Sequence, residues 1–366
     1  MDKFFLIDLQ LFAEAGTQVN ATGRYQNAYD ATDYTSFTPG GDDLGPLNKT
    51  FYDTELLDNA RDQLIFAQLG RKQALPKNHG RTVEWRKWNT LGRVGQLTEA
   101  VIPTGKKLGM TAITVTLAQY GDYVAISDLL ITHAIDDAVL GATEELGAAA
   151  GLTQDELVRN VLMAGTNIIF ARAYNSSGVE QTRPTTKATL LTALGNSYKC
   201  NLTAQMINEA VTNLKKGAKM LKYSGQYYVA VVHPSVAEDL RNDSAWIEAH
   251  KYMGAEEIYN GEIGRLHGVR FVESNLAPVI KVSGDSDAYA TYKTMFFAKD
   301  AFGVIDPEGG GLETIIKDKK EVGGPLEQFG TVGVKFETAA KILYQERMCT
   351  VWSGSSYSGT DVTNIA

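Results

Sequence analysis

The feature that most constrains this chain is a pair of alternating segments that are too charged to belong to a hydrophobic core. Apolar and polar residues alternate over 83–86 and again over 113–117. The stretch between the two segments is rich in glycine and proline, with Gly92, Gly95, Pro103, Gly105 and Gly109. This order predicts a long β-hairpin. Arms of about twenty residues, at about 3.3 Å per residue, would project on the order of 50 Å.

Charge segregates between this ribbon and the N-terminal region. Residues 71–107 contain nine basic and two acidic side chains, a balance of +7. Residues 1–60 contain three basic and ten acidic side chains, a balance of −7. The ribbon either folds over its own arm, forms a solvated charged surface, or lies on the arm or body of a second copy. We favour the second copy, because a lone two-stranded ribbon is marginal in water.

The ribbon contains the side chains that we expect to contact a neighbouring copy. Aromatic residues and arginine are the usual anchors of protein interfaces. Exposed ion pairs contribute only about 0–1 kcal/mol each, so charge would set the register while buried apolar area supplies the energy. The predicted contact residues are Arg81, Trp85, Arg86, Lys87, Trp88 and Arg93.

The composition is that of an ordinary folded protein, with 44% hydrophobic and 21% charged residues in 366. The net charge of −8 argues against a tight nucleic-acid binder, so DNA is the weaker alternative partner for the basic ribbon. Cys200 and Cys349 are far apart and form no CxxC motif. We therefore expect neither a disulfide framework nor a zinc site, and a reducing compartment fits.

The N-terminus is apolar but lacks the features of a secretory signal. Its longest clean apolar run, Phe4–Ile7, is too short, and acidic residues interrupt the region. No run reaches the roughly 18 apolar residues of a membrane span. We expect a cytosolic protein with no membrane partner. The apolar residues form either a short helix on the chain's own core or an arm that docks on a partner. The predicted arm contacts are Phe4, Phe5, Leu11 and Phe12.

Helical patterns follow the N-terminal region on both sides of the ribbon. Apolar residues at three- and four-residue spacing predict a helix over 56–68. A longer pattern over 127–165 predicts either one helix of nearly forty residues or two abutting helices, with a capping signature at Thr153–Glu156. A strand over 168–174 and a loop over 175–199 complete this region.

From residue 203 the pattern alternates between helices and strands. It predicts a compact α/β subdomain over 203–315, whose second helix begins at a capping box formed by Ser235 and Glu238. The alternation over 331–354 predicts a long strand that returns to pair with the strands of the first domain. Strands of the subdomain are predicted at 227–234, 268–274 and 294–305, and helices at 203–221 and 235–242.

The sequence contains almost no sign of enzymatic chemistry. None of the five histidines lies at metal-ligand spacing, and no nucleophile motif is present. The adjacent acidic pairs do not face each other on a helix. His233, just before Pro234, is best interpreted as a turn residue. We expect no catalytic site, no metal and no cofactor.

The order of these segments resembles the major capsid protein of tailed bacteriophages, with the Hong Kong 97-type fold. The opening DLQLFAE (8–14) is similar to that of many structural proteins from phages of Gram-positive hosts. Four further stretches are similar to one capsid family within the fold: LPKNHGRTVEWRKW (75–88), GLTQDELVRNVLMAGTN (151–167), NGEIGRLHGVRFVES (260–274) and QFGTVGVKFETAAKIL (328–343).

The resemblance implies an α+β fold with a flexible arm, an extended β-hairpin loop, a peripheral domain built on a long spine helix, and an axial α/β domain. Its parts would be the arm over 1–50, the extended loop over 76–122, the axial domain over 203–315, and a discontinuous peripheral domain over 51–75, 123–202 and 316–366 with its spine helix at about 127–165.

The resemblance also implies self-assembly into an icosahedral shell around double-stranded DNA. The partners would be other copies in hexamers and pentamers, a portal protein, and packaged DNA contacted non-specifically; a decoration protein is left open. A separate scaffold protein is implied, because the arm is too short to contain a fused one. Assembly would take place in the bacterial cytoplasm, and the product would be the virion capsid. We make no prediction about covalent crosslinking, since nothing identifies an acid catalyst or a partner for Lys87 and Asn89.

Three alternatives remain open from sequence. An encapsulin-type compartment shares the fold and would be distinguished by a cargo-docking site. An enzyme built on the α/β subdomain would need a pocket that holds His233 or His267 with a carboxylate. A DNA-binding protein would use the basic ribbon and bind less tightly as salt rises.

Overall fold

The computed structural model divides the chain into two units, Met1–Asn59 and Ala60–Ala366. The predicted arm over 1–50, with Phe4, Phe5, Leu11 and Phe12, lies outside the described residues, as does most of the helix predicted over 56–68. The structure describes residues 64–78, 80–100, 102–133, 137–217, 221–223, 227–250, 262–281, 289–322 and 327–357, without the side chains of 249–250 and 262–263.

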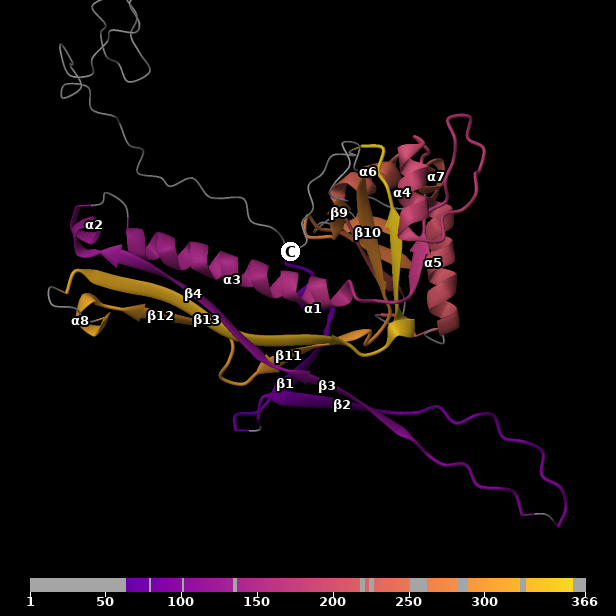
Figure 1. Ribbon diagram of the computed structural model, residues 1–366, viewed down its shortest axis with the longest axis horizontal. Coiled ribbons are helices and arrows are strands. Elements are labelled where there is room, and N and C mark those ends of the chain that lie inside the picture. Colours follow the sequence, from indigo (N-terminus) through magenta and orange to yellow (C-terminus); the bar gives the residue numbers. More distant parts are fainter. Residues whose placement is uncertain are drawn as a thin grey trace, which may run out of the picture. The chain divides into compact units, whose positions relative to one another are not determined.

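A five-stranded sheet contains the long returning strand that the sequence predicts (Figure 1). Its order is β1–β11–β13–β12, and β4 pairs with β13. Buried residues alternate along β13, as expected for a strand with one face on a core. All ten residues of β4 pair antiparallel with β13, so the predicted return of the tail is confirmed. The strands are β1 (Arg71–Leu75), β4 (Ala118–Ser127), β11 (Phe302–Pro307), β12 (Glu313–Lys317) and β13 (Phe329–Ile342).

Two helices, rather than one, occupy the long helical pattern. They are α2 (Asp128–His133) and α3 (Ala138–Leu162). The second helix begins where it does because the Asp137 carboxylate accepts hydrogen bonds from the N–H groups of Val139 and Leu140. The capping signature predicted at Thr153–Glu156 lies inside α3 and is wrong, since the Thr153 hydroxyl donates to the Ala149 carbonyl one turn earlier.

Helix α3 covers one face of the five-stranded sheet. Leu146 and Ala150 of the helix pack with Val332, Val334 and Phe336 of β13 in a common hydrophobic cluster. The side chains on β13 that make this contact are two residues apart, which is the spacing of one face of a strand. The long helix therefore lies along the long strand because both present a row of apolar side chains, at helical spacing on α3 and at every second residue on β13.

A seven-stranded sheet forms the α/β part of the structure, in the order β5–β14–β10–β6–β8–β7 with β9 paired to β10. Helices α5 (Ala204–Gly217), α6 (Pro234–Arg241) and α7 (Ser244–His250) contribute to the core on one face. The strands are β5 (Ile168–Phe170), β6 (Tyr228–Val232), β7 (Glu262–Leu266), β8 (Val269–Glu273), β9 (Val279–Lys281), β10 (Ala290–Phe297) and β14 (Met348–Ser353).

Sheet membership crosses the predicted domain ranges. The segment 294–305, predicted as one strand, forms the end of β10 and the start of β11, which belong to different sheets. A turn separates them, and Asp300 has a positive φ of 54° there. Strands β5 and β14 join the α/β sheet although both lie outside 203–315.

Two local predictions need correction. The predicted loop over 175–199 contains helix α4 (Lys187–Gly195), which is capped reciprocally by Thr186 and Thr189. Helix α6 is capped by His233 and not by the predicted Ser235–Glu238 box, because the His233 Nδ1 accepts from the Ser235 N–H at 3.2 Å. Short elements α8 (Lys319–Val322) and η3 (Gln345–Arg347) complete the described fold.

Buried charged residues on α3 link this helix to the start of α1 (Phe66–Leu69) and to the segment between β8 and β9. The carboxylate of Asp155 accepts from the N–H groups of Ile65 (3.2 Å) and Ala67 (2.7 Å) at the start of α1. Arg159, almost fully buried, donates to the Leu276 carbonyl at 3.3 Å. Burial raises the pKa of the Asp155 carboxyl, although the N–H donors and Arg159 oppose that rise.

Candidate inter-subunit surfaces

The predicted hairpin is present, but its paired part is shorter than expected. Strands β2 (Thr82–Trp88) and β3 (Met110–Thr116) pair antiparallel over seven residues each. Residues 89–109 continue outward without strand structure in the described part of that stretch (Figure 1). Lys106 Nζ donates to the Gly92 carbonyl at 2.9 Å and so holds the two legs of this outer segment together.

The base of the ribbon is fixed to its own chain. The Trp85 ring is half-buried and lies over Gly303 of β11 and beside Leu343. The Lys87 ammonium lies 5.0 Å from the centre of the Tyr344 ring, within cation–π range. Arg81 donates to the Leu117 carbonyl at 3.0 Å. Three of the six predicted contact residues of the ribbon therefore position it on its own subunit.

Gly303 leaves the space into which the Trp85 ring fits. A Cβ atom at position 303 would lie 2.9 Å from Trp85 Cζ2, closer than packed carbon atoms approach. We expect Gly303→Ala to displace the ring and to lower the free energy of unfolding by about 1–3 kcal/mol in urea titrations. Gly311→Ala is the matched control, because a Cβ there meets nothing within 4 Å. Equal stability of the two variants would contradict this account of the ribbon's base.

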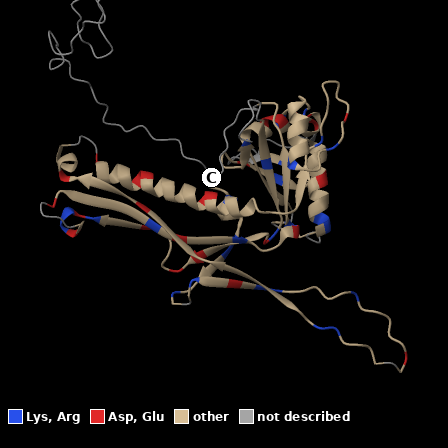
Figure 2. Ribbon diagram, viewed as in Figure 1, with Lys and Arg blue, Asp and Glu red and all other residues tan. Residues whose placement is uncertain are grey.

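The remaining predicted contact residues point away from the subunit's core. Trp88 is 65% exposed. Arg86 is also exposed and pairs with Glu84 at 2.6 Å, and Arg93 lies in the exposed outer segment. Figure 2 shows lysine and arginine along the ribbon beyond β2 and β3. These three residues, unlike Trp85, remain available to a second molecule.

The outer segment of the ribbon exposes apolar side chains that sequence reasoning missed. Val94 and Ile102 are 92% and 94% exposed. Exposed apolar residues that gather in one region are characteristic of interaction surfaces. Their spacing in the sequence matches neither a helix nor a strand, so no amphipathic pattern identifies them. The exposed apolar side chains of the ribbon are Trp88, Leu91, Val94, Leu97, Ile102, Leu108 and Met110. We call this set the ribbon surface.

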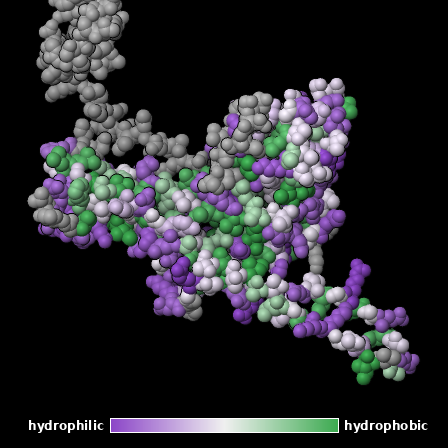
Figure 3. All heavy atoms as spheres, viewed as in Figure 1, coloured by the Kyte–Doolittle hydropathy of each residue, from purple (hydrophilic) through white to green (hydrophobic). Residues whose placement is uncertain are grey.

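A second exposed apolar region lies around α2 and the adjoining ends of β4 and β13. Figure 3 shows hydrophobic residues gathered there. The Asp128 N–H donates to the Gln328 carbonyl at 2.9 Å, which holds the start of α2 against the start of β13. The exposed apolar side chains of this α2 surface are Tyr123, Val124, Leu129, Leu130, Ile131, Leu140 and Phe329.

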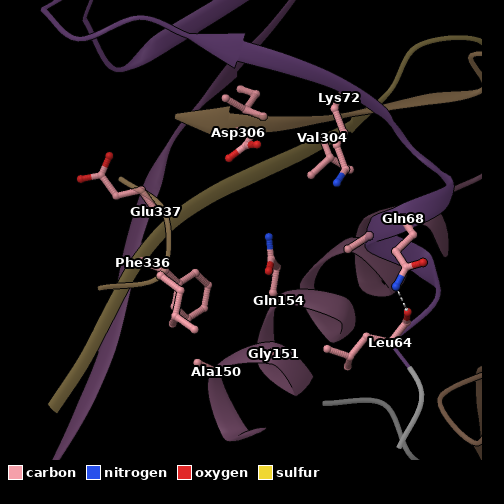
Figure 4. Close-up of a pocket in the computed structure, with 14 residues that line it drawn as sticks. Leu64, Gln68, Lys72, Ala150, Gly151, Gln154, Val304, Asp306, Phe336 and Glu337 are labelled. Carbon is pink, nitrogen blue, oxygen red and sulfur yellow. Dashed lines mark hydrogen bonds between the residues drawn. The ribbon is translucent and has the colours of Figure 1, made fainter. Parts of the chain in front are cut away.

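A pocket of about 330 Å³ lies between α1, α3 and the five-stranded sheet (Figure 4). Gln154 points into it from α3, and Phe336 closes one side. Asp306 and Glu337 contribute carboxylates from β11 and β13, and Lys72 an ammonium from β1. The lining of this pocket contains neither His233 nor His267, the residues that the enzyme alternative places in a pocket.

The two histidines of the enzyme alternative have structural roles. His233 caps α6, and its ring packs against Tyr292 with centroids 5.1 Å apart. His267 and Gly268 form the two-residue turn between β7 and β8, both with positive φ. In the described part of the chain, no three His, Cys, Asp or Glu side chains are grouped closely enough to hold a metal ion. Within those same residues no helix is both long and apolar enough to span a membrane.

Comparison with known proteins gives a consistent result. A family model described as phage capsid protein matches residues 111–342. No curated protein matches the sequence significantly. Three solved structures illustrate the shared fold at 13–17% identity. They are the capsid of cyanophage P-SCSP1u (TM-score 0.61, 14% identity, 88% of this chain and 100% of that one), the capsid asymmetric unit of cyanophage Pam1 (0.64, 13%, 85% and 97%) and the capsid of Ralstonia phage GP4 (0.59, 17%, 89% and 100%).

These matches confirm the predicted α+β fold of the Hong Kong 97 type. The family match begins at β3 and ends with β13, so it includes α3 and most of both sheets. Strand β2, at the base of the ribbon, precedes the residues that the family model matches. The contacts of Trp85 and Lys87 are therefore the evidence for how this base is fixed to the subunit.

Proposed function

Because this chain belongs to the phage capsid protein family, we propose that it is the major capsid subunit, which assembles with copies of itself into an icosahedral shell around double-stranded DNA. A capsid protein is a structural component of the virion and not an enzyme. The observation that carries the assembly step is the ribbon surface. An isolated subunit would leave seven apolar side chains of that surface in water, which favours burial against another copy.

The charges of the ribbon would orient this contact while its apolar side chains supply the energy. Burial stabilises by about 25 cal/mol per Å² of apolar area, whereas each exposed ion pair adds only about 0–1 kcal/mol. Trp88, Arg86 and Arg93 are the predicted anchors that the subunit itself leaves exposed. We assign Arg81, Trp85 and Lys87 to a different task, which is to hold the ribbon at a defined angle.

The domain roles follow from the same proposal. The ribbon would be the extended loop, the five-stranded sheet with α3 the peripheral domain, and the seven-stranded sheet the axial domain that gathers in pentamers and hexamers. The α2 surface at the end of the peripheral domain would be a second contact between copies. A separate scaffold protein, a portal protein, a decoration protein and packaged DNA remain proposed partners.

The phage capsid family match favours a DNA-containing capsid over an encapsulin-type compartment. The two alternatives predict different neighbouring genes, since a compartment would travel with a cargo gene. The ribbon alone does not favour a DNA-binding protein, because its surface combines cations with exposed apolar side chains that an interface between proteins buries.

Charge reversal on the ribbon tests the proposal. We expect Arg86→Glu with Arg93→Glu to lower the yield of closed shells more than about tenfold, because like charges at an interface cost several kcal/mol. The subunit itself should keep its stability, since both side chains are exposed. The matched control reverses Lys215 and Lys216, which are exposed in the last turn of α5. Shell yield is counted by electron microscopy, and a wild-type yield from the ribbon variant would refute the contact.

A further inference from the structure

Two lysines share one indole ring on the seven-stranded sheet. Lys293 of β10 and Trp352 of β14 are directly opposite in the antiparallel register. The Lys293 Nζ lies 4.3 Å from the centre of the Trp352 ring, and the Lys187 Nζ lies 5.8 Å from it. Both distances are within cation–π range. Two ammonium groups beside one ring repel each other, so the arrangement is incomplete without a negative charge.

Lys293 is unusual because its side chain is buried and pairs with no carboxylate of the residues that the structure describes. Only 6% of the residue is exposed. Among the described residues, neither Lys293 nor Lys187 forms an ion pair with a carboxylate, and no hydrogen bond links the Lys293 ammonium to the protein. Burial, followed by the nearby charge of Lys187, lowers the pKa of Lys293 to about 8. The group therefore remains mostly protonated at neutral pH.

Two arginines near this site, unlike the lysines, are paired with a carboxylate. Arg183 donates to the carbonyl of Phe170, whose ring packs against Trp352. Its guanidinium is neutralised by Glu209 at 2.7 Å, and Glu209 also pairs with Arg172. Burial opposes ionisation of Glu209, but these arginines outweigh it and lower the pKa of that carboxyl. Glu209 thus neutralises the neighbouring arginines, whereas no carboxylate among the described residues pairs with Lys293 or Lys187.

Helix α4 adds a third source of positive potential. Lys187 is its first residue, so the N-terminal end of a nine-residue helix lies at the same place. The Thr186 hydroxyl already caps the Thr189 N–H, and the helix dipole still favours an anion at this end. Lys293, Lys187 and the α4 terminus thus converge beside the Trp352 ring.

We propose that Lys293, Lys187 and the Trp352 ring form a binding site for a single carboxylate, supplied in the assembled shell by an acidic side chain of a neighbouring copy. A carboxylate on a flexible side chain can reach a buried ammonium, whereas a continuous DNA backbone contacts exposed cations. The chain also has acidic residues in excess, with a net charge of −8. The source of the carboxylate rests on the proposed assembly; the site itself does not.

The site is tested first on the unassembled chain, with acetate as the probe. Thermal midpoints are measured in increasing acetate, with ionic strength held constant by chloride. We expect the wild-type midpoint to rise by about 2–4 °C at a tenfold excess over the dissociation constant. Lys293→Met and Lys187→Met should each remove that rise, and Lys215→Met on α5 should keep it. A rise that survives in both site variants, or is absent from wild type, overturns the site.

The source of the carboxylate is tested by acetic anhydride labelling of Lys293, read by mass spectrometry. Labelling that falls at least tenfold from the unassembled chain to DNA-free shells supports a neighbouring copy. Protection that appears only in DNA-filled shells overturns that source in favour of phosphate. Labelling that increases in the unassembled Asp285→Asn, Asp287→Asn double variant shows that a carboxylate of the same chain fills the site and also overturns it. If no shells form, the proposed assembly and the neighbouring copy as source of the carboxylate are both contradicted. The acetate experiment still decides whether the site itself exists, because it uses the unassembled chain.

Discussion

We expect that replacing residues 90–108 with the dipeptide Asn-Gly abolishes the formation of closed shells while the subunit stays folded. The dipeptide fits because the Asn89 N–H donates to the Gly109 carbonyl at 2.9 Å, so a two-residue turn can close the ladder there. The deletion removes most of the ribbon surface, including Val94 and Ile102, but leaves β2, β3 and the Trp85 contact with Gly303.

The measurement combines electron microscopy of shells with a thermal midpoint of the unassembled subunit. We expect shell yield below about a tenth of wild type, because losing a central apolar cluster commonly costs more than about 2 kcal/mol at each interface. The midpoint should change little, since every deleted residue that the structure describes is exposed. A full-length control, in which Leu91, Val94, Leu97 and Ile102 become serine, separates the loss of apolar area from the loss of length. Normal shells from the deletion variant would show that the ribbon is dispensable.

The second large effect is on subunit stability. Asp155→Ala removes the acceptor for the N–H groups of Ile65 and Ala67. It also removes the nearby negative charge of Asp155, so that Glu156 at 3.6 Å is the remaining carboxylate beside the buried Arg159. Unpaired buried donors cost about 1–3 kcal/mol each, and breaking a buried ionic cluster costs about 3–5 kcal/mol. We expect the free energy of unfolding to fall by about 3–5 kcal/mol.

Chemical denaturation of the unassembled subunit measures this loss. Asp155→Asn retains one carbonyl acceptor and should lose roughly half as much stability as the alanine variant. Glu156→Ala is the matched control on the same helix turn, because Glu156 is exposed enough to be solvated and its ion pair with Arg159 is long. A loss below about 1 kcal/mol for Asp155→Ala would mean that water satisfies the groups it leaves behind.

The sequence predicted those parts of the fold that depend on long, regular apolar periods. The pairing of β13 with β4 follows from alternation over 331–342, and α3 follows from the helical period after Ala138. The division between β10 and β11 was missed because apolar residues continue through both strands, and only the Asp300 turn marks the break. Helix α4 was missed because nine residues give too little period to distinguish from a loop.

The inter-subunit role of the ribbon residues remains a prediction, and the structure shows how each of them lies on its own subunit. Basic and aromatic residues on an alternating ribbon were sufficient to select Trp88, Arg86 and Arg93 as exposed groups. The contact of Trp85 with its own chain depends on Gly303, which is far along the sequence, and no local pattern connects the two residues. For the same reason, no sequence pattern brought Lys187 beside Lys293, since the contact exists only after α4 packs near β10 and β14.

The most direct test of the central claim is electron cryomicroscopy of particles formed by the full chain with its neighbouring genes. The account predicts closed icosahedral shells in which residues 89–109 of each subunit lie against a neighbouring copy, with Trp88 buried at the contact. Particles that stay monomeric, or shells in which the ribbon remains in solvent, would contradict it.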